Sequence, residues 1–449
     1  MRSFPIAIMA LGLELTLWPL SQVDVRLDTP GAIRLMMLAS LIYLVSMVYV
    51  IRRKPLISKA FVLVAAAVFR MTMAPVEPTL SDDVYRYRWE GLVQSRGLNP
   101  YLVSPSATDR DAAYTRIPAP DVRSGYGPVA SLTEWAGFAL ARRLADDPAR
   151  QAFWMKLPSI AFETITLLAL GRALPVERLL IYAWSPLPVI EFWWNGHNDA
   201  MAVFYMVMAL LLARRESWAA AHGALGLAIA VKWWPAVLWP LLMAKTPRWR
   251  RAAWIAPVVV AAAALPYWTP AWREMITNAR YMSGFVGGWR NNDSVYGLLL
   301  AATGDQYLAK YAAFAILAAA VAWMIARQWS LERAALGAVV VMLLVSANCH
   351  PWYLTWLVPL AAFTPWPPVF VWQLSMPMAY MVLVDWHARG IWVGSRPGRW
   401  WIYAPVFASM GAWAWWTTRS LPYRSGRQSR SSSTPDGLRQ RQTRDPPPV

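Results

Sequence analysis

Long apolar stretches separated by short polar or charged segments occupy most of the chain. Windows of about 19 residues predict membrane spans at 4–20, 32–51, 57–75, 152–171, 179–194, 198–213, 218–231, 233–244, 252–268, 307–326, 334–347, 351–363, 367–384 and 401–417. A helix that crosses the hydrocarbon core of a bilayer needs about 20 mostly apolar residues. The pattern predicts an all-α polytopic membrane protein with about fourteen transmembrane helices, whose outer loops carry short amphipathic helices.

The composition supports a membrane protein over a soluble one. Hydrophobic residues make up 57% of the 449 residues and charged residues only 15%, whereas soluble domains are about 25% charged. The single cysteine, Cys349, excludes an internal disulfide and any metal site built from several cysteines. No other constellation demands a metal, so we expect no cofactor, with a divalent ion as an open alternative.

The positive charges predict how the chain crosses the membrane. The formal net charge is +18, and basic clusters follow several predicted spans, among them 52–54, 214–215 and 245–251. Basic loops stay in the cytoplasm, and all clusters can lie there only if both termini are cytoplasmic. This topology requires the apolar run 126–141 to lie along the outer interface instead of crossing. Since the excess charge is explained by topology, we expect no nucleic-acid partner.

The predicted topology divides the chain into two parts and defines one functional face. Residues 1–418 form the membrane domain, whose outer loops at 77–150, 195–199 and 269–306 hold almost all the unusual polar residues. Residues 419–449, rich in Arg, Ser, Gln and Pro, cannot bury a core and are predicted to be a disordered cytoplasmic tail. We therefore expect a multi-pass protein of the cell membrane with an active site on the extracytoplasmic face.

The first outer loop contains two adjacent carboxylates, Asp82 and Asp83. A short helix here would place Asp82 and Arg86 on one face, and Asp83 and Tyr87 on another. Such a helix could be an interfacial one whose Arg side chains meet lipid phosphates. Paired carboxylates at the mouth of a membrane span, where burying ions is costly, instead indicate a functional site. These residues alone leave both interpretations open.

Three further polar positions lie at the outer ends of predicted spans. Residues 195–199 (Asn-Gly-His-Asn-Asp) could form only a tight turn, or His197 and Asp199 could bind a sugar, a phosphate or part of a divalent-ion site. Lys232 ends the seventh span, where snorkelling to the interface explains it as well as a function does. His350 follows the eleventh span.

Taken in order along the chain, these motifs resemble a known family. They are Asp82-Asp83 with Arg86-Tyr87 and Trp89-Glu90-Gly91, then Gly97-x-Asn99-Pro100-Tyr101, Tyr126-Gly127-Pro128, Gly196-His197-Asn198-Asp199, Lys232-x-x-Pro235 and His350-Pro351-Trp352-Tyr353. The set is similar to that of the polytopic GT-C glycosyltransferases, and closest to the bacterial polyprenol-phosphate-mannose-dependent mannosyltransferases. Two features depart from the family pattern: Glu90, where Asp is expected, and the pair of spans before residue 56.

The resemblance implies a membrane enzyme that moves a hexose, first of all mannose, from a polyprenyl-phosphate-sugar donor to a glycan or glycolipid acceptor at the outer leaflet, with inversion. An acidic residue of the first outer loop would be the general base, because the acceptor hydroxyl must lose a proton as it attacks the anomeric carbon. Asp83 and Asp82 are the candidates. We prefer Asp83, because Asp82 shares a helix face with Arg86.

The other site residues follow from the chemistry of such a donor. The anionic polyprenyl phosphate needs fixed cations, and the candidates are Arg86, Arg88, Lys232, Arg290 and a protonated His350. Sugar or acceptor contacts are expected from polar and aromatic residues of the same motifs: Trp89, Glu90, Asn99, Tyr101, Asn195, His197, Asp199, Asn292 and Asp293.

A polytopic secondary transporter or lipid-linked sugar flippase is the main alternative. Transporters carry charged residues near the membrane midplane, in broken helices of paired halves. Here the polar motifs lie at outer ends, and Glu14 and Glu163 are the main exceptions. A scaffold with a basic tail would leave the outer motifs without a purpose. We therefore predict an enzyme whose partners are the lipid-linked donor, the acceptor and the bilayer.

Overall fold

The computed structural model describes residues 4–247, 251–271 and 289–419. The regular elements in these ranges are all helices, and an isolated β-bridge joins Asn291 to Asn348. The predicted all-α fold class is therefore confirmed. Part of the predicted third outer loop, 272–288, and residues 420–449 of the predicted tail lie outside the described residues.

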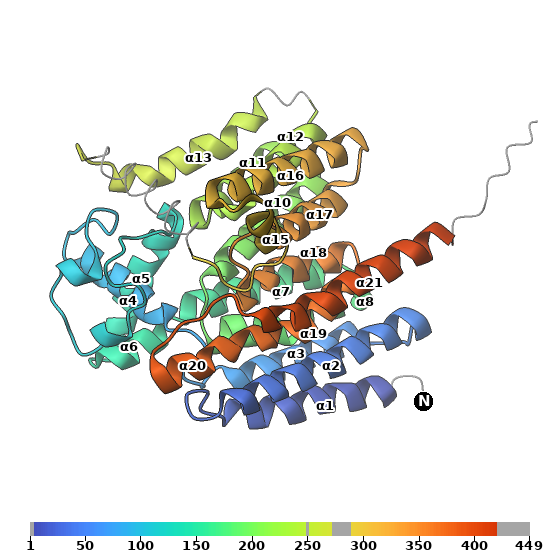
Figure 1. Ribbon diagram of the computed structural model, residues 1–449, viewed down its shortest axis with the longest axis horizontal. Coiled ribbons are helices and arrows are strands. Elements are labelled where there is room, and N and C mark those ends of the chain that lie inside the picture. The colour runs from blue at the N-terminus through green and yellow to red at the C-terminus, as the bar shows by residue number, and fades with distance from the viewer. Residues whose placement is uncertain (1–3, 248–250, 272–288, 420–449) are drawn as a thin grey trace, which may run out of the picture.

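Three helices at the N-terminal end of the chain pack side by side (Figure 1). They are α1 (Phe4–Ser21), α2 (Thr29–Arg53) and α3 (Lys59–Met73). Asp28 determines where α2 begins, because its carboxylate accepts the backbone N–H of Gly31 at 2.8 Å and satisfies one of the free donors of the first turn. Lys54 ends the helix with a left-handed backbone.

Five helical segments are long and apolar enough to cross a membrane: Phe4–Ser21, Thr29–Arg53, Pro148–Ala173, Gln306–Ala326 and Pro367–Arg389. Large apolar side chains, such as Leu15 and Trp18 of α1 and Phe314 of α16 (Gln306–Ala326), are exposed on their outer faces. Lipid is the medium in which such surfaces are stable. The chain is thus an apolar helical membrane protein, but the larger number of spans predicted from hydropathy is not confirmed.

Further helices are parts of two of these segments, Pro148–Ala173 and Pro367–Arg389, together with α21 (Trp400–Arg419) and the shorter helices of other predicted spans. They are α7 (Leu157–Ala173), α8 (Val176–Ala183), α9 (Pro186–Pro188), α10 (Asp199–Arg214), α11 (Trp218–Val231), α12 (Trp239–Lys245), α13 (Ile255–Ala264), α17 (Leu331–Leu344), α18 (Leu357–Phe363), α19 (Pro367–Ser375), α20 (Val382–Arg389) and α21, with α15 (Val295–Thr303) beside α16. Proline lacks a backbone N–H and disturbs the preceding turn. Prolines accordingly stand at the irregular turns η3 (Val189–Trp194), η4 (Trp234–Leu238), η7 (Pro351–Trp356) and η8 (Met376–Met381).

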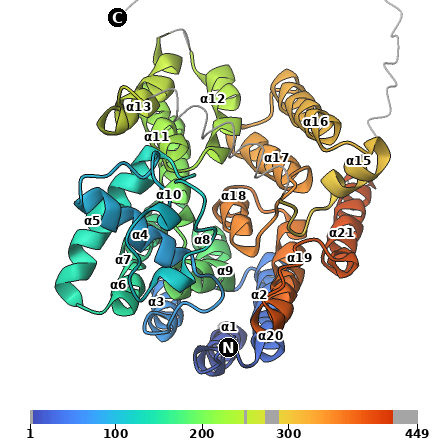
Figure 2. The same ribbon diagram turned by 60° about the vertical axis from the view of Figure 1, so that its left-hand side comes forward.

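A helical cap, residues 81–154, lies at one end of the long helices. It contains α4 (Asp83–Ser95), α5 (Pro128–Leu144) and α6 (Pro148–Trp154), grouped at the left of Figure 1 and brought forward in Figure 2. Val84 and Val93 of α4 and Phe138 of α5 belong to one buried cluster. Most of the apolar run that was predicted to lie along the interface forms α5, which packs against α4 and α6 and is not one of the five candidate spans.

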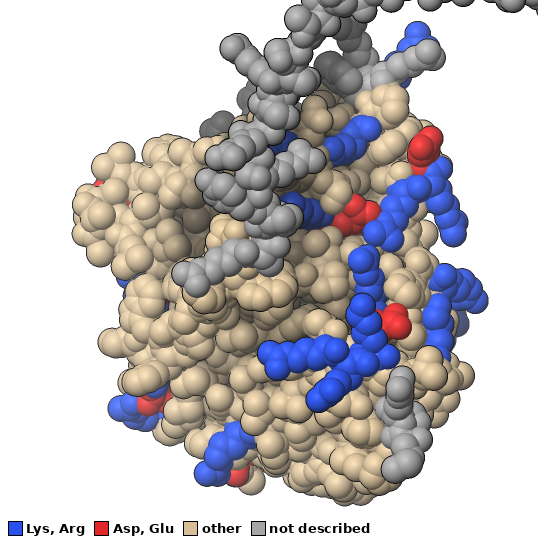
Figure 3. All heavy atoms as spheres, turned by 90° about the vertical axis from the view of Figure 1, so that its right-hand side faces the viewer, with Lys and Arg blue, Asp and Glu red and all other residues tan. Residues whose placement is uncertain are grey.

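Basic side chains gather at the opposite end of the molecule, which faces the viewer in Figure 3. Contacts tie the ends of several helices together there. Lys59 donates to the backbone carbonyls of Gly171 and Leu174 at 2.7 and 3.0 Å, and Arg214 pairs with Glu332 at 2.5 Å. The start of α1 and the end of α21 lie at this same end (Figure 1). The helical cap and the basic clusters therefore occupy opposite ends of the helices.

Candidate active site

Asp83 stands at the first position of α4, where the helix dipole favours a negative charge. Its Oδ2 lies 3.4 Å from Nδ1 of His197 and accepts a hydrogen bond from the hydroxyl of Tyr87 at 3.4 Å. The side chain is 21% exposed. Burial by itself would raise the pKa of Asp83, but the contact with His197 and the charges of His197 and Lys232 lower it below its ordinary value. Asp83 is therefore an ionised carboxylate that remains accessible, and the predicted helix face that it shares with Tyr87 is confirmed.

Asp82 has a different partner from the one that the sequence suggested. Its carboxylate pairs with Arg116, whose guanidinium also lies 4.0 Å from the centre of the Tyr85 ring. Arg86, the predicted partner of Asp82, instead pairs with Glu90 at 3.2 Å. The reason is that Arg116 approaches from a distant part of the loop, which helical spacing does not reveal. Asp82 is thus held in an ion pair at the rim of the cap.

Other predicted residues of the first loop hold the cap together. Glu90 is fully buried and accepts hydrogen bonds from Arg86 and from Ser124, the latter at 2.7 Å. Arg88 is buried and donates to Gln151 at 2.9 Å and to Asp111 at 2.7 Å. Both Arg side chains therefore have carboxylate partners within the cap and are poorly placed to meet a phosphate.

Three more predicted ligand contacts also bond to the protein itself. Trp89 donates its indole N–H to Thr108 at 3.0 Å. Asn99 donates to the carbonyl of Tyr267 at 2.9 Å, and the hydroxyl of Tyr101 donates to the carbonyl of Tyr126 at 3.0 Å. These bonds link the cap internally and to the segment after α13.

The segment 195–199 contacts Asp83 through His197. Gly196 has a φ of +71°, and a Cβ there would lie only 3.0 Å from Cα of Lys156, so glycine is needed for both backbone shape and space. The hydroxyl of Ser159 donates to the carbonyls of Gly196 and His197 at 2.8 and 2.9 Å. Asn195 accepts the backbone N–H of Leu80 at 3.2 Å. The segment is more than a tight turn, because these bonds hold His197 against Asp83.

His197 and His350 stack on opposite sides of the same indole. The ring of each histidine lies 4.3 Å from that of Trp352, with interplanar angles of 19° and 6°. Burial lowers the pKa of His350 to about 4. His350 is therefore neutral at pH 7 in this site, which contradicts the prediction of a protonated His350 and leaves it a hydrogen-bonding role.

Lys232 is brought to the same region by the end of α11. Its ammonium donates to Asp199 Oδ2 at 2.5 Å, while the indole N–H of Trp356 donates to Oδ1 at 2.7 Å. Asp199 is fully buried, whereas the side chain of Lys232 is 16% exposed. The end of α11 packs closely against Gly127, because a Cβ at this position would lie only 2.2 Å from the carbonyl oxygen of Ala230. The ammonium thus reaches the site and is held by a buried carboxylate.

The predicted residues of the third outer loop form a separate cluster. Arg290 pairs with Asp293 at 2.8 Å, and Asn292 donates to the carbonyl of Cys349 at 3.2 Å. The hydroxyl of Tyr403 donates to the carbonyl of Asn292 at 2.5 Å. Within the described residues, these side chains contact neighbours at 289–297, 347–349 and 376–403 and not Asp83. The loop anchors the segment that carries His350.

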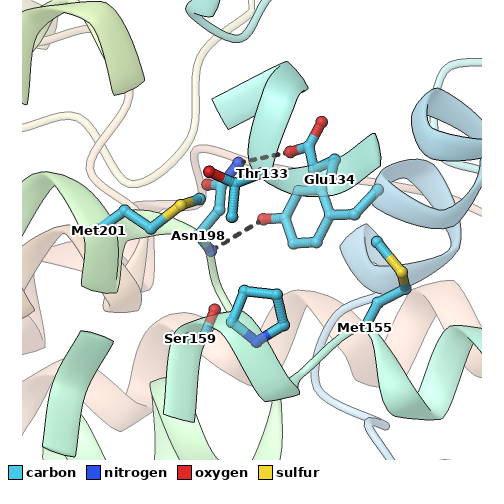
Figure 4. A pocket seen from close by; sticks show the side chains of 8 residues that line it. Thr133, Glu134, Met155, Ser159, Asn198 and Met201 are labelled. Carbon is cyan, nitrogen blue, oxygen red and sulfur yellow. Dashed lines mark hydrogen bonds between the residues drawn. The ribbon is translucent and has the colours of Figure 1, made fainter. Parts of the chain in front are cut away.

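A small pocket beside the site is lined by Tyr87 and by the residues labelled in Figure 4, which are Thr133, Glu134, Met155, Ser159, Asn198 and Met201. The hydroxyl of Tyr87 accepts the backbone N–H of Asn198 at 3.3 Å, and the Asn198 amide donates to Glu134 at 3.1 Å. Burial, reinforced by the charge of Glu90, raises the pKa of Glu134 well above its ordinary value. In the described part of the chain, no group of three or more His, Cys, Asp or Glu side chains is arranged to hold a metal ion.

Glu191, Tyr380 and Trp352 are site residues that sequence analysis did not select. Glu191 lies in η3 with its Oε2 at 3.5 Å from Nε2 of His197, and its Oε1 accepts the hydroxyl of Tyr380 at 2.8 Å. A carboxylate inside the apolar run 179–194 is a signal that could have identified Glu191. Trp352 was part of a quoted motif, while Tyr380 has no sequence signal.

Comparison with protein families decides which class of enzyme this site belongs to. The model of the alpha-(1->6)-mannopyranosyltransferase N-terminal domain matches residues 19–248, about half of the chain. The chain belongs to this mannosyltransferase family. The family confirms the resemblance to the GT-C mannosyltransferases, and it favours a membrane mannosyltransferase over a transporter. No curated protein and no solved structure matches the chain.

The matched region of this mannosyltransferase contains most of the cluster around Asp83. His197, Asp199 and Lys232 lie within it, as does Glu191. His350 lies beyond it, on the part of the chain that follows the matched domain. The two parts therefore meet at Trp352, between the two histidines.

Proposed function

We propose that this mannosyltransferase moves mannose from a polyprenyl-phosphate-mannose donor to a hydroxyl of a glycan or glycolipid acceptor, with inversion, and that Asp83 is the general base. The observation that carries the proposal is the position of Asp83. It is an ionised and partly exposed carboxylate beside a lysine, two histidines and several stacked aromatic rings. Transfer to a hydroxyl requires such a base within reach of the acceptor.

The donor phosphate is assigned to Lys232 and His350. The charge of Lys232 acts on both Asp83 and His350, so the three groups are electrostatic neighbours. An anionic leaving group is stabilised by a fixed ammonium and by hydrogen bonds. Arg86 and Arg88 have carboxylate partners in the cap, and we now assign them to its stability. Arg290 pairs with Asp293 and is a more remote candidate.

The sugar is assigned to the aromatic side chains around the two histidines. The rings of Tyr353 and Trp356 stack at 4.4 Å, and those of Trp356 and Trp234 at 4.3 Å. Aromatic faces suit the apolar faces of a hexose and the isoprenoid chain. His197 and Asp199 were predicted as sugar contacts, but both are buried and face partners inside the protein, so we assign them to the support of this surface.

The site is proposed to face away from the cytoplasm. The gathering of Lys and Arg at the far end of the helices supports this orientation (Figure 3), because basic helix ends stay on the cytoplasmic side. Both termini would then be cytoplasmic. Residues 1–418 would form the membrane enzyme and 419–449 a cytoplasmic tail.

The adjacent carboxylates provide a matched test. Asp83→Asn preserves size but removes the base, so turnover should fall by about 10² or more with little change in donor affinity. Asp82→Asn breaks the ion pair with Arg116 and should lower turnover far less. Near-normal turnover of correctly inserted Asp83→Asn protein would refute the assignment.

A further inference from the structure

A row of buried polar groups extends from Asp83 into the protein. Nδ1 of His197 lies 3.4 Å from Asp83 Oδ2, and Nε2 of the same ring lies 3.5 Å from Glu191 Oε2. The other oxygen of Glu191 accepts the hydroxyl of Tyr380 at 2.8 Å. An imidazole thus sits between two carboxylates, one facing the site and one facing the core.

The surroundings hold this imidazole in place. The side chain of His197 is fully buried and that of Glu191 is 1% exposed. Both ring nitrogens of His197 are buried, and within the described part of the chain neither has a hydrogen-bond partner, so the two carboxylates are its nearest acidic neighbours. The backbone N–H of His197 donates to the carbonyl of Glu191 at 2.9 Å, and Trp352 covers one ring face. Glu191 itself lies in the short π-helix η3, and π-helical turns are often found at functional sites.

We propose that His197 and Glu191 form a proton-accepting pair behind Asp83, an inference that rests on the proposed function of Asp83. The acceptor hydroxyl oxygen bonds to the anomeric carbon as the bond from that carbon to the phosphate oxygen breaks, and polyprenyl phosphate leaves with the electron pair. The acceptor O–H bond breaks in the same step, and its proton goes to Asp83 Oδ2. Asp83 then gives the proton to Nδ1 of His197 and returns to the carboxylate form. Glu191 is a positioning residue: its carboxylate, when ionised, directs the proton of the neutral ring to Nε2 and stabilises the imidazolium that forms. After the product leaves, the imidazolium releases the proton to water through Asp83.

Two physical arguments support this division of roles. A carboxylate beside an imidazole holds a proton less well than the imidazole does, and the contact with His197 indeed lowers the pKa of Asp83. An imidazole ring can hold a proton on each of its two nitrogens, so His197 can accept a proton at Nδ1 while it keeps another at Nε2. The other ionisable side chains around His197 and Glu191 are Asp83, Tyr87, Asp199, Lys232, His350 and Tyr380.

The pH dependence of turnover distinguishes this pair from a structural one. With the pair in place, the acid limb of kcat should lie in the range of an imidazole. Glu191→Gln removes the charge that stabilises the imidazolium, so the limb should move to lower pH by about one unit, with turnover about tenfold lower and the donor KM within about twofold. Glu191→Asp keeps the charge and should keep the limb in place. His197→Gln should move the limb below about pH 4, into the range of a carboxylate.

A buried histidine far from the site provides the control. His222 lies 3.1 Å from Thr246, and His222→Gln should leave the pH profile unchanged. If Glu191→Gln fails to insert, Tyr380→Phe removes the hydrogen bond that favours the Glu191 carboxylate and should move the limb in the same direction by a smaller amount.

The outcomes separate this inference from the function on which it rests. If Glu191→Gln or Tyr380→Phe lowers turnover equally at all pH values and leaves the acid limb of kcat in place, the proton-accepting role of His197 and Glu191 is refuted. The assignment of Asp83 as the base would still stand if Asp83→Asn protein were inactive. Full activity of Asp83→Asn would overturn the proposed function, and the inference with it.

Discussion

The role of Lys232 leads to a prediction that separates ligand binding from stability. Lys232→Ala removes the ammonium proposed to hold the donor phosphate. A charge-assisted hydrogen bond contributes about 1.5–3 kcal/mol, and each 1.4 kcal/mol is about tenfold in affinity. The donor should therefore bind about 10- to 140-fold more weakly, and turnover should fall as well.

The same substitution also removes a partner from a buried carboxylate. Asp199 is fully buried and would keep only the Trp356 indole at 2.7 Å. Leaving one half of a buried pair costs about 3–5 kcal/mol of stability. The double variant Lys232→Ala/Asp199→Asn removes both charges, and the asparagine can still accept from Trp356. It should therefore recover most of the lost thermal stability without recovering donor affinity.

The assay is titration of protein in lipid nanodiscs with polyprenyl-phosphate-mannose, together with thermal unfolding of each variant. Lys54→Ala, at an exposed position of the basic end, is the control for loss of a lysine. If the double variant regains donor affinity along with stability, Lys232 acts only through the fold. Unchanged affinity in the single variant would refute its contact with the phosphate.

Two further predictions concern the cap. The first uses protein in which Cys349 is replaced by Ala and a cysteine is introduced at Asp109, whose side chain is 95% exposed. This cysteine should react with a membrane-impermeant thiol reagent added outside intact cells, whereas a cysteine introduced at Glu216 should not. The reverse pattern would refute the proposed orientation. Arg86→Ala leaves the Glu90 carboxylate buried without its partner and should cost about 3–5 kcal/mol of stability, measured by thermal unfolding, with donor KM unchanged. Normal stability with weaker donor binding would instead support a phosphate contact of Arg86.

The helical fold was largely predictable because apolar runs are a strong signal. Each predicted span coincides with a helix or an interrupted helix, and 218–231 matches α11 at both ends. The way in which a helix is interrupted was less predictable. Pro188 is visible in the sequence, but the π-helix η3 that follows it depends on packing and on the hydrogen bonds that Asn195 donates to the carbonyl of Ile190.

The site was predictable only in part, because spacing along a helix reveals local partners and not distant ones. The face shared by Asp83 and Tyr87 was predicted correctly, since those residues are four apart. The pair of Asp82 with Arg116 joins residues far apart in the loop, and no pattern indicated it. Glu191 stands among apolar neighbours in the run 179–194, and an ionisable residue within such a run is itself a signal of function.

The prediction that Asn292 and Asp293 contact the sugar rested on their position in an outer loop. The structure instead connects them to Cys349, Arg290 and Tyr403. A sequence cannot distinguish a polar group that binds a ligand from one that joins two segments of the chain, because the same side chains do both.

We have proposed that mannose passes from a polyprenyl phosphate to an acceptor with Asp83 as the base. The most direct measurement is transfer of radiolabelled mannose by purified protein in liposomes, with polyprenyl-phosphate-mannose and GDP-mannose compared as donors. We expect labelled product from the lipid-linked donor and not from the nucleotide, and about a hundredfold less or lower still from Asp83→Asn than from wild type. Transfer from the nucleotide donor alone, or equal transfer by wild type and Asp83→Asn, would contradict it.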